Sequence, residues 1–190
     1  EGKRNPGPSL HRIDAKISKK FFKNWVWAPK TFNKHAYMPS FFAQSNNSEP
    51  RFMKKNIAEV NAMAEFIFQE SESYVPFAKY VKGDVEKGKE LISQVGCISC
   101  HGIEGFEEES AKVNGNAGPY LTGTGSKIKD VNWLVSWLKK PNHYQEDTIM
   151  PSFRLSDKEA NDIAAYLMSL KNDKFDSLSF EPMDGEIRDE

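Results

Sequence analysis

Residues 97–101 read Cys97-Ile98-Ser99-Cys100-His101 and contain both cysteines of the chain. A C-x-x-C-H sequence is typical of the site at which a c-type haem is attached. The two thiols add to the two vinyl groups of the haem, and one helical turn between the cysteines matches the separation of those groups. The histidine that follows then lies beneath the iron as its proximal ligand. The pentapeptide therefore predicts one haem c, attached at Cys97 and Cys100, with His101 bound to the iron.

The pentapeptide alone leaves three other roles open for these cysteines. A thioredoxin-like C-x-x-C would be set in a β-α-β pattern, and no such pattern surrounds this one. A zinc site would need two more ligands close by, whereas the other three histidines are scattered along the chain. A simple disulfide is possible, but it leaves His101 without a role. Haem attachment is the interpretation that uses all three residues.

A second axial ligand for the iron is expected at Met150, which lies 49 residues after His101. A thioether is a soft ligand that favours reduced iron and raises the potential of a His/Met haem. Pro151 restricts the methionine to extended backbone, which helps to aim the sulfur. The alternative is that Met150 is an ordinary core methionine. Its spacing from His101 and the helical patterns that flank it favour the ligand.

The composition indicates a packed core and two parts of opposite charge. Of 190 residues, 38% are hydrophobic and 28% are charged, which argues against wholesale disorder. No apolar run approaches the ~20 residues that span a bilayer, and two cysteines are too few for a disulfide-stapled small domain. Residues 1–55 contain 12 Lys and Arg against 3 Asp and Glu, whereas residues 56–190 contain 14 against 24. We therefore expect two modules with different surroundings, and electrostatic steering toward oppositely charged partners.

Residues 84–171 resemble a class I cytochrome c domain, because six motifs of that family occur in the expected order. They are Gly88 with Leu91, Ile92 and Val95; Cys97-x-x-Cys100-His101; Gly118-Pro119-Tyr120-Leu121; Trp133-Leu134-x-x-Trp137-Leu138 with Pro141; Met150-Pro151; and Ile163-Ala164-Ala165-Tyr166-Leu167. The resemblance implies a small all-α bundle around one haem. It also implies that Pro119 backs the proximal histidine and that Met150 is the distal ligand.

Helix signals predict the same fold class without the resemblance. Ser156-Asp157-Lys158-Glu159 has the form of a capping box. The apolar residues behind it recur at helical spacing, namely Ile163, Tyr166, Leu167 and Leu170. Asp130 is a candidate N-cap for a helix with an apolar face. No clear period-2 alternation occurs along the chain, so we predict an all-α fold.

The first part of the chain repeats motifs of the second. A shift of 112 positions places Met38-Pro39-Ser40-Phe41 on Met150-Pro151-Ser152-Phe153, Trp25 on Trp137, Pro29 on Pro141 and Ser18 on the N-cap Asp130. A shift of 111 places Gly7-Pro8-Ser9-Leu10 on residues 118–121, and a shift of 100 places Asn56-x-x-Glu59 on Ser156-x-x-Glu159. The polar stretch 43–51 is expected to be a surface loop. We predict two cytochrome c-like helical domains in tandem, the first lacking its C-x-x-C-H segment.

The absent C-x-x-C-H leaves two explanations for the first domain. A segment that carries a first haem would precede Glu1, or this repeat has lost its haem. The retained Met38-Pro39 favours the first explanation, so a diheme arrangement with Met38 as distal ligand is expected. His35, three residues earlier, is an alternative ligand. His11 and His143 have no ligand-like partner and are expected at the surface or beside a propionate.

The predicted organisation has four parts. Residues 1–70 form a partial cytochrome c-like domain, residues 71–83 a linker, residues 84–171 a complete cytochrome c domain, and residues 172–190 an acidic, irregular tail. Because thioether attachment generally occurs outside the cytoplasm, the resemblance points to a periplasm or an equivalent compartment. Membrane association is expected only through a partner or an anchor outside this sequence.

Two occupied axial positions leave the iron no open site for substrate, so electron transfer is expected rather than catalysis. The chain would act as a diheme cytochrome or as the cytochrome c subunit of a larger respiratory redox complex, with redox proteins as partners and no nucleic acid. The alternative is a haem enzyme of the diheme peroxidase kind. It would need a distal methionine that can leave and a nearby acid-base residue. Nothing in the sequence singles out that residue, although Glu146 and Asp147 lie near the methionine loop.

Overall fold

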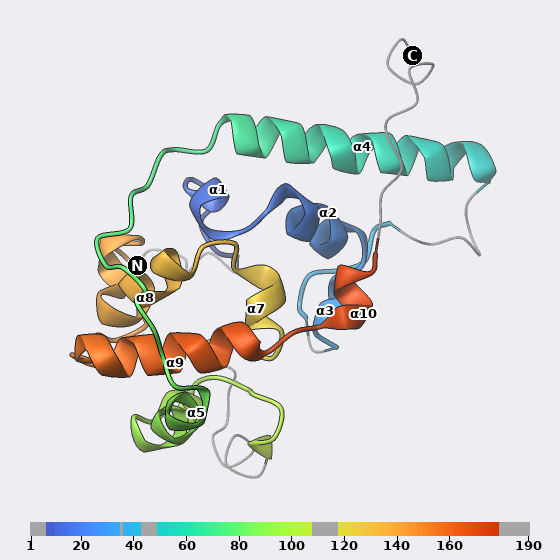
Figure 1. The fold of residues 1–190 in the computed structure, drawn as a ribbon. Helices are drawn as coiled ribbons and strands as arrows, with labels where there is room; N and C mark the ends of the chain where they lie inside the picture. Colours follow the sequence, from blue (N-terminus) through green and yellow to red (C-terminus); the bar gives the residue numbers. More distant parts are fainter. Residues whose placement is uncertain (1–6, 35, 43–48, 108–117, 179–190) are drawn as a thin grey trace, which may run out of the picture.

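The computed structural model describes residues 7–34, 36–42, 49–107 and 118–178. The regular elements among these residues are helices, apart from one isolated antiparallel bridge between Ile17 and Ile128. The predicted all-α fold is therefore confirmed (Figure 1). Within the described part of the chain, no helix is both long and apolar enough to cross a bilayer.

The second half of the chain forms a helical unit around its own apolar core. Its elements are α5 (Val85–Gln94), η1 (Cys97–Ser99), α7 (Thr124–Lys127), α8 (Val131–Lys139), η2 (Pro141–His143) and α9 (Asp157–Ser169). The capping box predicted at the start of α9 is present, because Ser156 accepts from Glu159 N and the Glu159 carboxylate accepts from Ser156 N. Asp130 likewise caps α8 by accepting from Asn132 N at 2.8 Å. Local sequence therefore determines where these two helices begin.

Helices α5 and α9 cross at very close range, and Gly88 makes this crossing possible (Figure 1). A Cβ atom at Gly88 would lie 2.0 Å from the carbonyl oxygen of Asp162. The buried Asp162 carboxylate accepts from Asp84 N at 2.9 Å and from Lys158 Nζ at 2.6 Å, so its charge is paired within the crossing. The crossing positions α5, and with it the pentapeptide that follows.

The first part of the chain forms a second helical unit with its own core. Its elements are α1 (Ile13–Lys16), α2 (Lys19–Trp27), α3 (Pro29–Phe32) and α4 (Pro50–Gln69), and α4 lies along α1 and α2 in Figure 1. Ser18 caps α2 by accepting from Phe21 N at 3.1 Å, as its alignment with Asp130 predicts.

The helix expected near Asn56 begins earlier than the repeat indicates. Helix α4 starts at Pro50, so Asn56 lies inside it and does not act as its N-cap. Proline is favoured in the first helical turn, where its missing N–H is not needed. The surface loop predicted for 43–51 is therefore wrong at its end, and residues 43–48 lie outside the described part of the chain.

Residues 172–178 differ from the irregular tail predicted for 172–190. They form a short helix, α10 (Asp173–Asp176), which packs against α3 and α7. Phe175 has no exposed surface and lies in the core of the first unit, 5.1 Å from the ring of Phe21 and 4.9 Å from that of Phe32. The buried Asn24 donates to Phe175 O at 3.0 Å. The end of the second unit thus completes the core of the first.

Replacing Phe175 with alanine is expected to destabilise the protein by about 3–5 kcal/mol, because it empties a fully buried aromatic site. Urea unfolding of the full chain, followed by far-UV circular dichroism, measures the loss. Phe77→Ala is the control, because Phe77 is 48% exposed and is expected to cost far less. A loss of under about 1 kcal/mol for Phe175→Ala would show that α10 contributes little to the fold.

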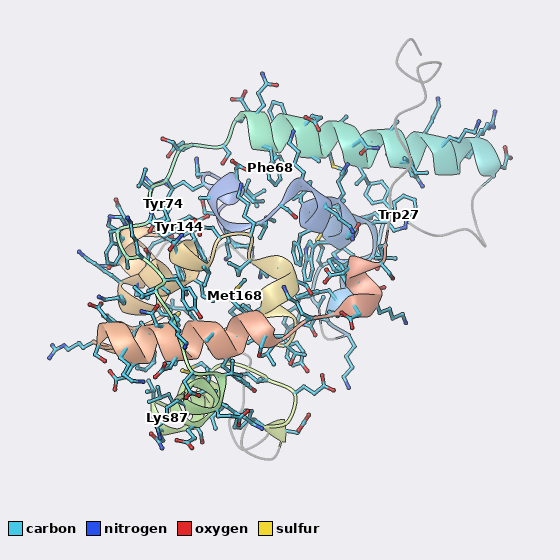
Figure 2. All side chains as sticks on the ribbon, in the orientation of Figure 1. Trp27, Phe68, Tyr74, Lys87, Tyr144 and Met168 are labelled. Atoms are coloured by element: carbon cyan, nitrogen blue, oxygen red, sulfur yellow. The ribbon has the colours of Figure 1, made fainter. Side chains whose placement is uncertain are left out.

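Residues 71–83, the predicted linker, contain no helix and run across α8 and α9. Backbone N–H groups of Ala78, Tyr80 and Val81 donate to side chains on those helices, Ser136, Asn132 and Asn161 respectively, at 2.8 to 3.0 Å. Tyr74 packs edge-on against Tyr144, with the ring centroids 5.0 Å apart. Figure 2 labels the two residues next to each other. These contacts attach the segment between the two units to the second of them.

Candidate functional site

The predicted site residues of the second unit meet at one hollow. Cys97, Cys100, His101, Pro119 and Met150 all line it. The rest of its wall is mainly apolar and comes from α5, α7 with the residue after it, α8, α9 and the segments 118–121 and 148–153. Its apolar members include Ile92, Leu121, Ile128, Trp133, Leu134, Trp137, Leu138 and Leu167. The structure therefore brings together residues that lie up to 53 positions apart in the sequence.

His101 has one ring nitrogen engaged by the backbone and the other available. Its Nδ1 lies 2.7 Å from the carbonyl oxygen of Pro119. A carbonyl oxygen only accepts hydrogen bonds, so Nδ1 carries the proton and the neutral ring keeps a lone pair on Nε2. Burial lowers the pKa of His101, although the bond to Pro119 opposes this change. The ring is thereby prepared as a neutral, oriented metal ligand.

Gly118 is required by the close approach of the backbone to that ring. A Cβ atom at this position would lie 2.3 Å from Cε1 of His101. Two backbone hydrogen bonds align the segment with the pentapeptide, from Gly118 N to Cys100 O and from Leu121 N to Gly102 O, both 2.9 Å long. The Gly118-Pro119 pair therefore supports the histidine with backbone atoms.

Gly118→Ala is expected to displace the His101 ring, because the added methyl group overlaps it and overpacking of this kind typically costs about 1–3 kcal/mol. The measurement is the absorption and electron paramagnetic resonance spectrum of the ferric holoprotein, which reports the axial ligands. A mixed or high-spin spectrum is expected. Gly7→Ala is the control, because nothing lies within 4 Å of a Cβ atom there. A low-spin spectrum identical to that of the native protein in Gly118→Ala would contradict the steric argument.

The two cysteines occupy a single turn beside the histidine. The 3-10 helix η1 begins at Cys97, and His101 N donates to Cys97 O at 3.0 Å. Both thiols are free, so the disulfide interpretation finds no support here. Burial raises the pKa of Cys97, while Cys100 is exposed. No cluster of three or more His, Cys, Asp or Glu that could bind a metal ion occurs within residues 7–34, 36–42, 49–107 and 118–178, so the zinc interpretation has no ligand set there.

The Met150 loop is tied to the helix that precedes it. Met150 N donates to Thr148 Oγ1 at 3.3 Å, and Ser152 Oγ donates to the carbonyl oxygen of Lys139 at 3.1 Å. Trp133 and Trp137 stack within the wall of the hollow, with centroids 5.5 Å apart. The thioether is thus presented to an apolar hollow by a loop with defined backbone contacts.

The first unit contributes a wall residue that sequence reasoning missed. Lys16 lines the hollow together with Lys127. Lys16 Nζ lies 5.0 Å from the ring centroid of Trp133 and 5.8 Å from that of Trp137. The shift of 111 positions that aligns Gly7 with Gly118 also aligns Lys16 with Lys127. That coincidence is the signal in the sequence that could have identified them.

The other candidate residues that the structure describes do not line this hollow. Met38 is partly buried against the core of the first unit and does not line the hollow of Met150. His35 lies outside the described residues. His11 is exposed, 3.9 Å from the Glu72 carboxylate, and His143 is exposed and hydrogen-bonded to Tyr74 Oη at 3.1 Å.

The donor set of the hollow suits a covalently attached haem. It combines two free thiols one turn apart, an imidazole with a free nitrogen, a thioether and apolar walls. Trp133 is only 2% exposed, and its Nε1–H has no hydrogen-bond partner within the described part of the chain. A buried donor without a partner is costly and indicates an acceptor that a bound group would supply.

One family model and one relative match this chain, and the family model covers most of the second unit. The family model described as "Cytochrome c" matches residues 85–171. A protein of Synechocystis sp. (strain ATCC 27184 / PCC 6803 / Kazusa), named "Cytochrome c-553-like", is 30% identical over 112 residues, which cover 57% of this chain and 90% of that protein. No solved structure matches the chain.

Proposed function

The chain belongs to the cytochrome c family, and on that premise we propose that residues 84–171 transfer single electrons through one haem c. Cys97 and Cys100 would form the thioether bonds, and His101 and Met150 would be the axial ligands. Family membership supports haem-based electron transfer and implies a covalently bound haem c. The roles of the individual residues belong to the proposal.

The observation that carries the proposal is the bond from His101 Nδ1 to the Pro119 carbonyl oxygen, next to two free thiols and on the same hollow as Met150. When bound, the haem supplies an iron that alternates between its ferric and ferrous states. His101 and Met150 would occupy both axial positions, so electrons would pass without substrate binding to the metal. The apolar walls exclude water, and the soft thioether favours the reduced state.

We further propose that the first unit holds a second haem and that the chain is part of a larger redox complex. Met38-Pro39-Ser40-Phe41 repeats the motif at Met150, so Met38 is the proposed distal ligand of a diheme arrangement. The two units are in direct contact, because Arg12 donates to Tyr144 O at 3.2 Å and Tyr144 Oη donates to Arg12 O at 2.7 Å. The partners would be redox proteins of a respiratory chain in a periplasm, and the opposite charges of residues 1–55 and 56–190 suit electrostatic steering toward them.

The test is the intact mass and the optical spectrum of the protein purified from its natural source. We expect covalently added haem, a c-type α-band on reduction, and the ferric band that marks methionine on iron. The mass also counts the haems. Absence of the α-band would refute haem-based electron transfer. Rapid peroxide turnover or carbon monoxide binding by the native protein would favour the peroxidase alternative instead.

A further inference from the structure

Lys16 reaches the hollow because its segment is attached across the boundary between the two units. Ile17 and Ile128 form the isolated antiparallel bridge, and Lys129 N donates to Lys16 O at 3.0 Å. Outside the bridge, the Lys129 ammonium lies 2.6 Å from the Asp14 carboxylate. These contacts join positions more than 100 residues apart and determine where the Lys16 side chain begins.

The Lys16 and Lys127 side chains bring two positive charges to one apolar hollow. Both line it, and Lys16 lies over the Trp133–Trp137 stack. Among the described residues, neither ammonium has a hydrogen bond or an ion pair, whereas the neighbouring Lys129 is paired with Asp14. Burial is the main cause that lowers the pKa of Lys16 to about 7, and the charge of Lys127 adds to it. Burial lowers the pKa of Lys127 as well.

The wall of the hollow contains the ammonium groups of Lys16 and Lys127 and the unpaired Nε1–H of Trp133. An anion bound in the hollow would compensate the two charges and accept the hydrogen bond. Burying like charges side by side is unfavourable unless an opposite charge compensates them. The described residues that line the hollow include no Asp or Glu. A haem carries two propionate carboxylates, and these are anions with several hydrogen-bond acceptor positions.

We propose that Lys16, supplied by the first unit, binds a propionate carboxylate of the haem held by the second unit, together with Lys127 and the Nε1–H of Trp133. The inference rests on the proposed function, because it requires a haem in this hollow. It assigns to residues 7–34 a direct part in the cofactor site of the other unit. Neither the C-x-x-C-H motif nor the family match, which begins at residue 85, includes that contribution.

The charge of Lys16 has a measurable consequence for the haem. A cation near the haem disfavours the ferric state, which is one charge more positive than the ferrous state. Replacing Lys16 with methionine is therefore expected to shift the one-electron equilibrium toward the ferric form roughly threefold to tenfold, where tenfold corresponds to 59 mV. Lys127→Met is expected to shift it in the same direction.

The experiment is spectroelectrochemical titration of the full-length holoprotein and its variants at one pH and one salt concentration. Lys16→Arg preserves the charge and is expected to stay within about twofold of the native equilibrium. Lys30→Met removes the same charge from an exposed position of the first unit and is expected to leave the equilibrium unchanged. The ferric methionine–iron band should persist in every variant, which separates a propionate effect from a displaced Met150.

Each outcome decides the inference. Lys16→Gln replaces Lys16→Met if the methionine variant does not mature. Haem incorporation that fails in both neutral variants but succeeds in Lys16→Arg supports the charge contact. An unchanged reduction potential in the neutral variants overturns the inference. It is also overturned if the potential of Lys16→Arg falls as far as that of Lys16→Met, or if Lys16→Arg fails to incorporate haem. Absence of haem from the native protein would instead refute the proposed function.

Discussion

Replacing Met150 with leucine is expected to lower the reduction potential of the haem and to open an axial position on the iron. Leucine has a similar volume but no donor atom, so the hollow stays filled while the ligand is lost. Because a thioether favours ferrous iron, its loss shifts the one-electron equilibrium toward the ferric form by at least about tenfold, or 59 mV. Potentiometric titration measures this shift, and the ferric methionine–iron band should disappear.

Carbon monoxide binding provides the second measurement on Met150→Leu. The reduced variant should bind carbon monoxide rapidly, whereas the native protein should not. Met168→Leu is the matched control, because Met168 packs against the same core but does not line the hollow. A native potential in Met150→Leu would remove Met150 from the ligand set and leave it as a core methionine.

Replacing Cys97 and Cys100 together with alanine is expected to abolish covalent haem attachment. No other cysteine exists in the chain to form a thioether. A haem-stained denaturing gel and the intact mass measure the covalently bound haem of the second unit, which should fall from one equivalent to none. Without its cofactor, the apolar hollow is exposed to water, so the double variant should also unfold at lower urea concentration.

Single substitutions and a neighbouring residue control this result. Cys97→Ala and Cys100→Ala should each retain one thioether and shift the α-band of the reduced protein, because one vinyl group stays unsaturated. Ser99→Ala changes an exposed position between them and should attach haem normally. Covalent haem in the double variant would place its attachment outside the pentapeptide and contradict the proposed site.

Much of the second unit could be predicted because its signals act over short distances. The capping box at Ser156 and the N-cap at Asp130 depend on residues two or three positions away, and both are present as predicted. The start of α4 could not be predicted as well. The repeat suggested Asn56 as the N-cap, but Glu49 is the N-cap and a favourable proline follows it, so the helix begins seven residues earlier.

The burial of Phe175 had no local signal. Phe175 lies in an acidic segment without a helical apolar pattern, which predicts an irregular tail. Only its contacts with Phe21 and Phe32 make it a core residue. The reason for Gly118 also lies in the tertiary structure. The resemblance supplies the motif, but glycine is required because a Cβ atom at this position would lie 2.3 Å from Cε1 of His101.

By itself, the sequence determined the fold class and which donor groups the second unit contains. Two thiols and an imidazole within five residues, a methionine before a proline and apolar residues at helical spacing are properties of neighbouring positions. The tertiary structure alone decided that Lys16 faces the same hollow as Lys127. That placement depends on the bridge between Ile17 and Ile128, two residues brought together by packing of the two units and not by any local preference.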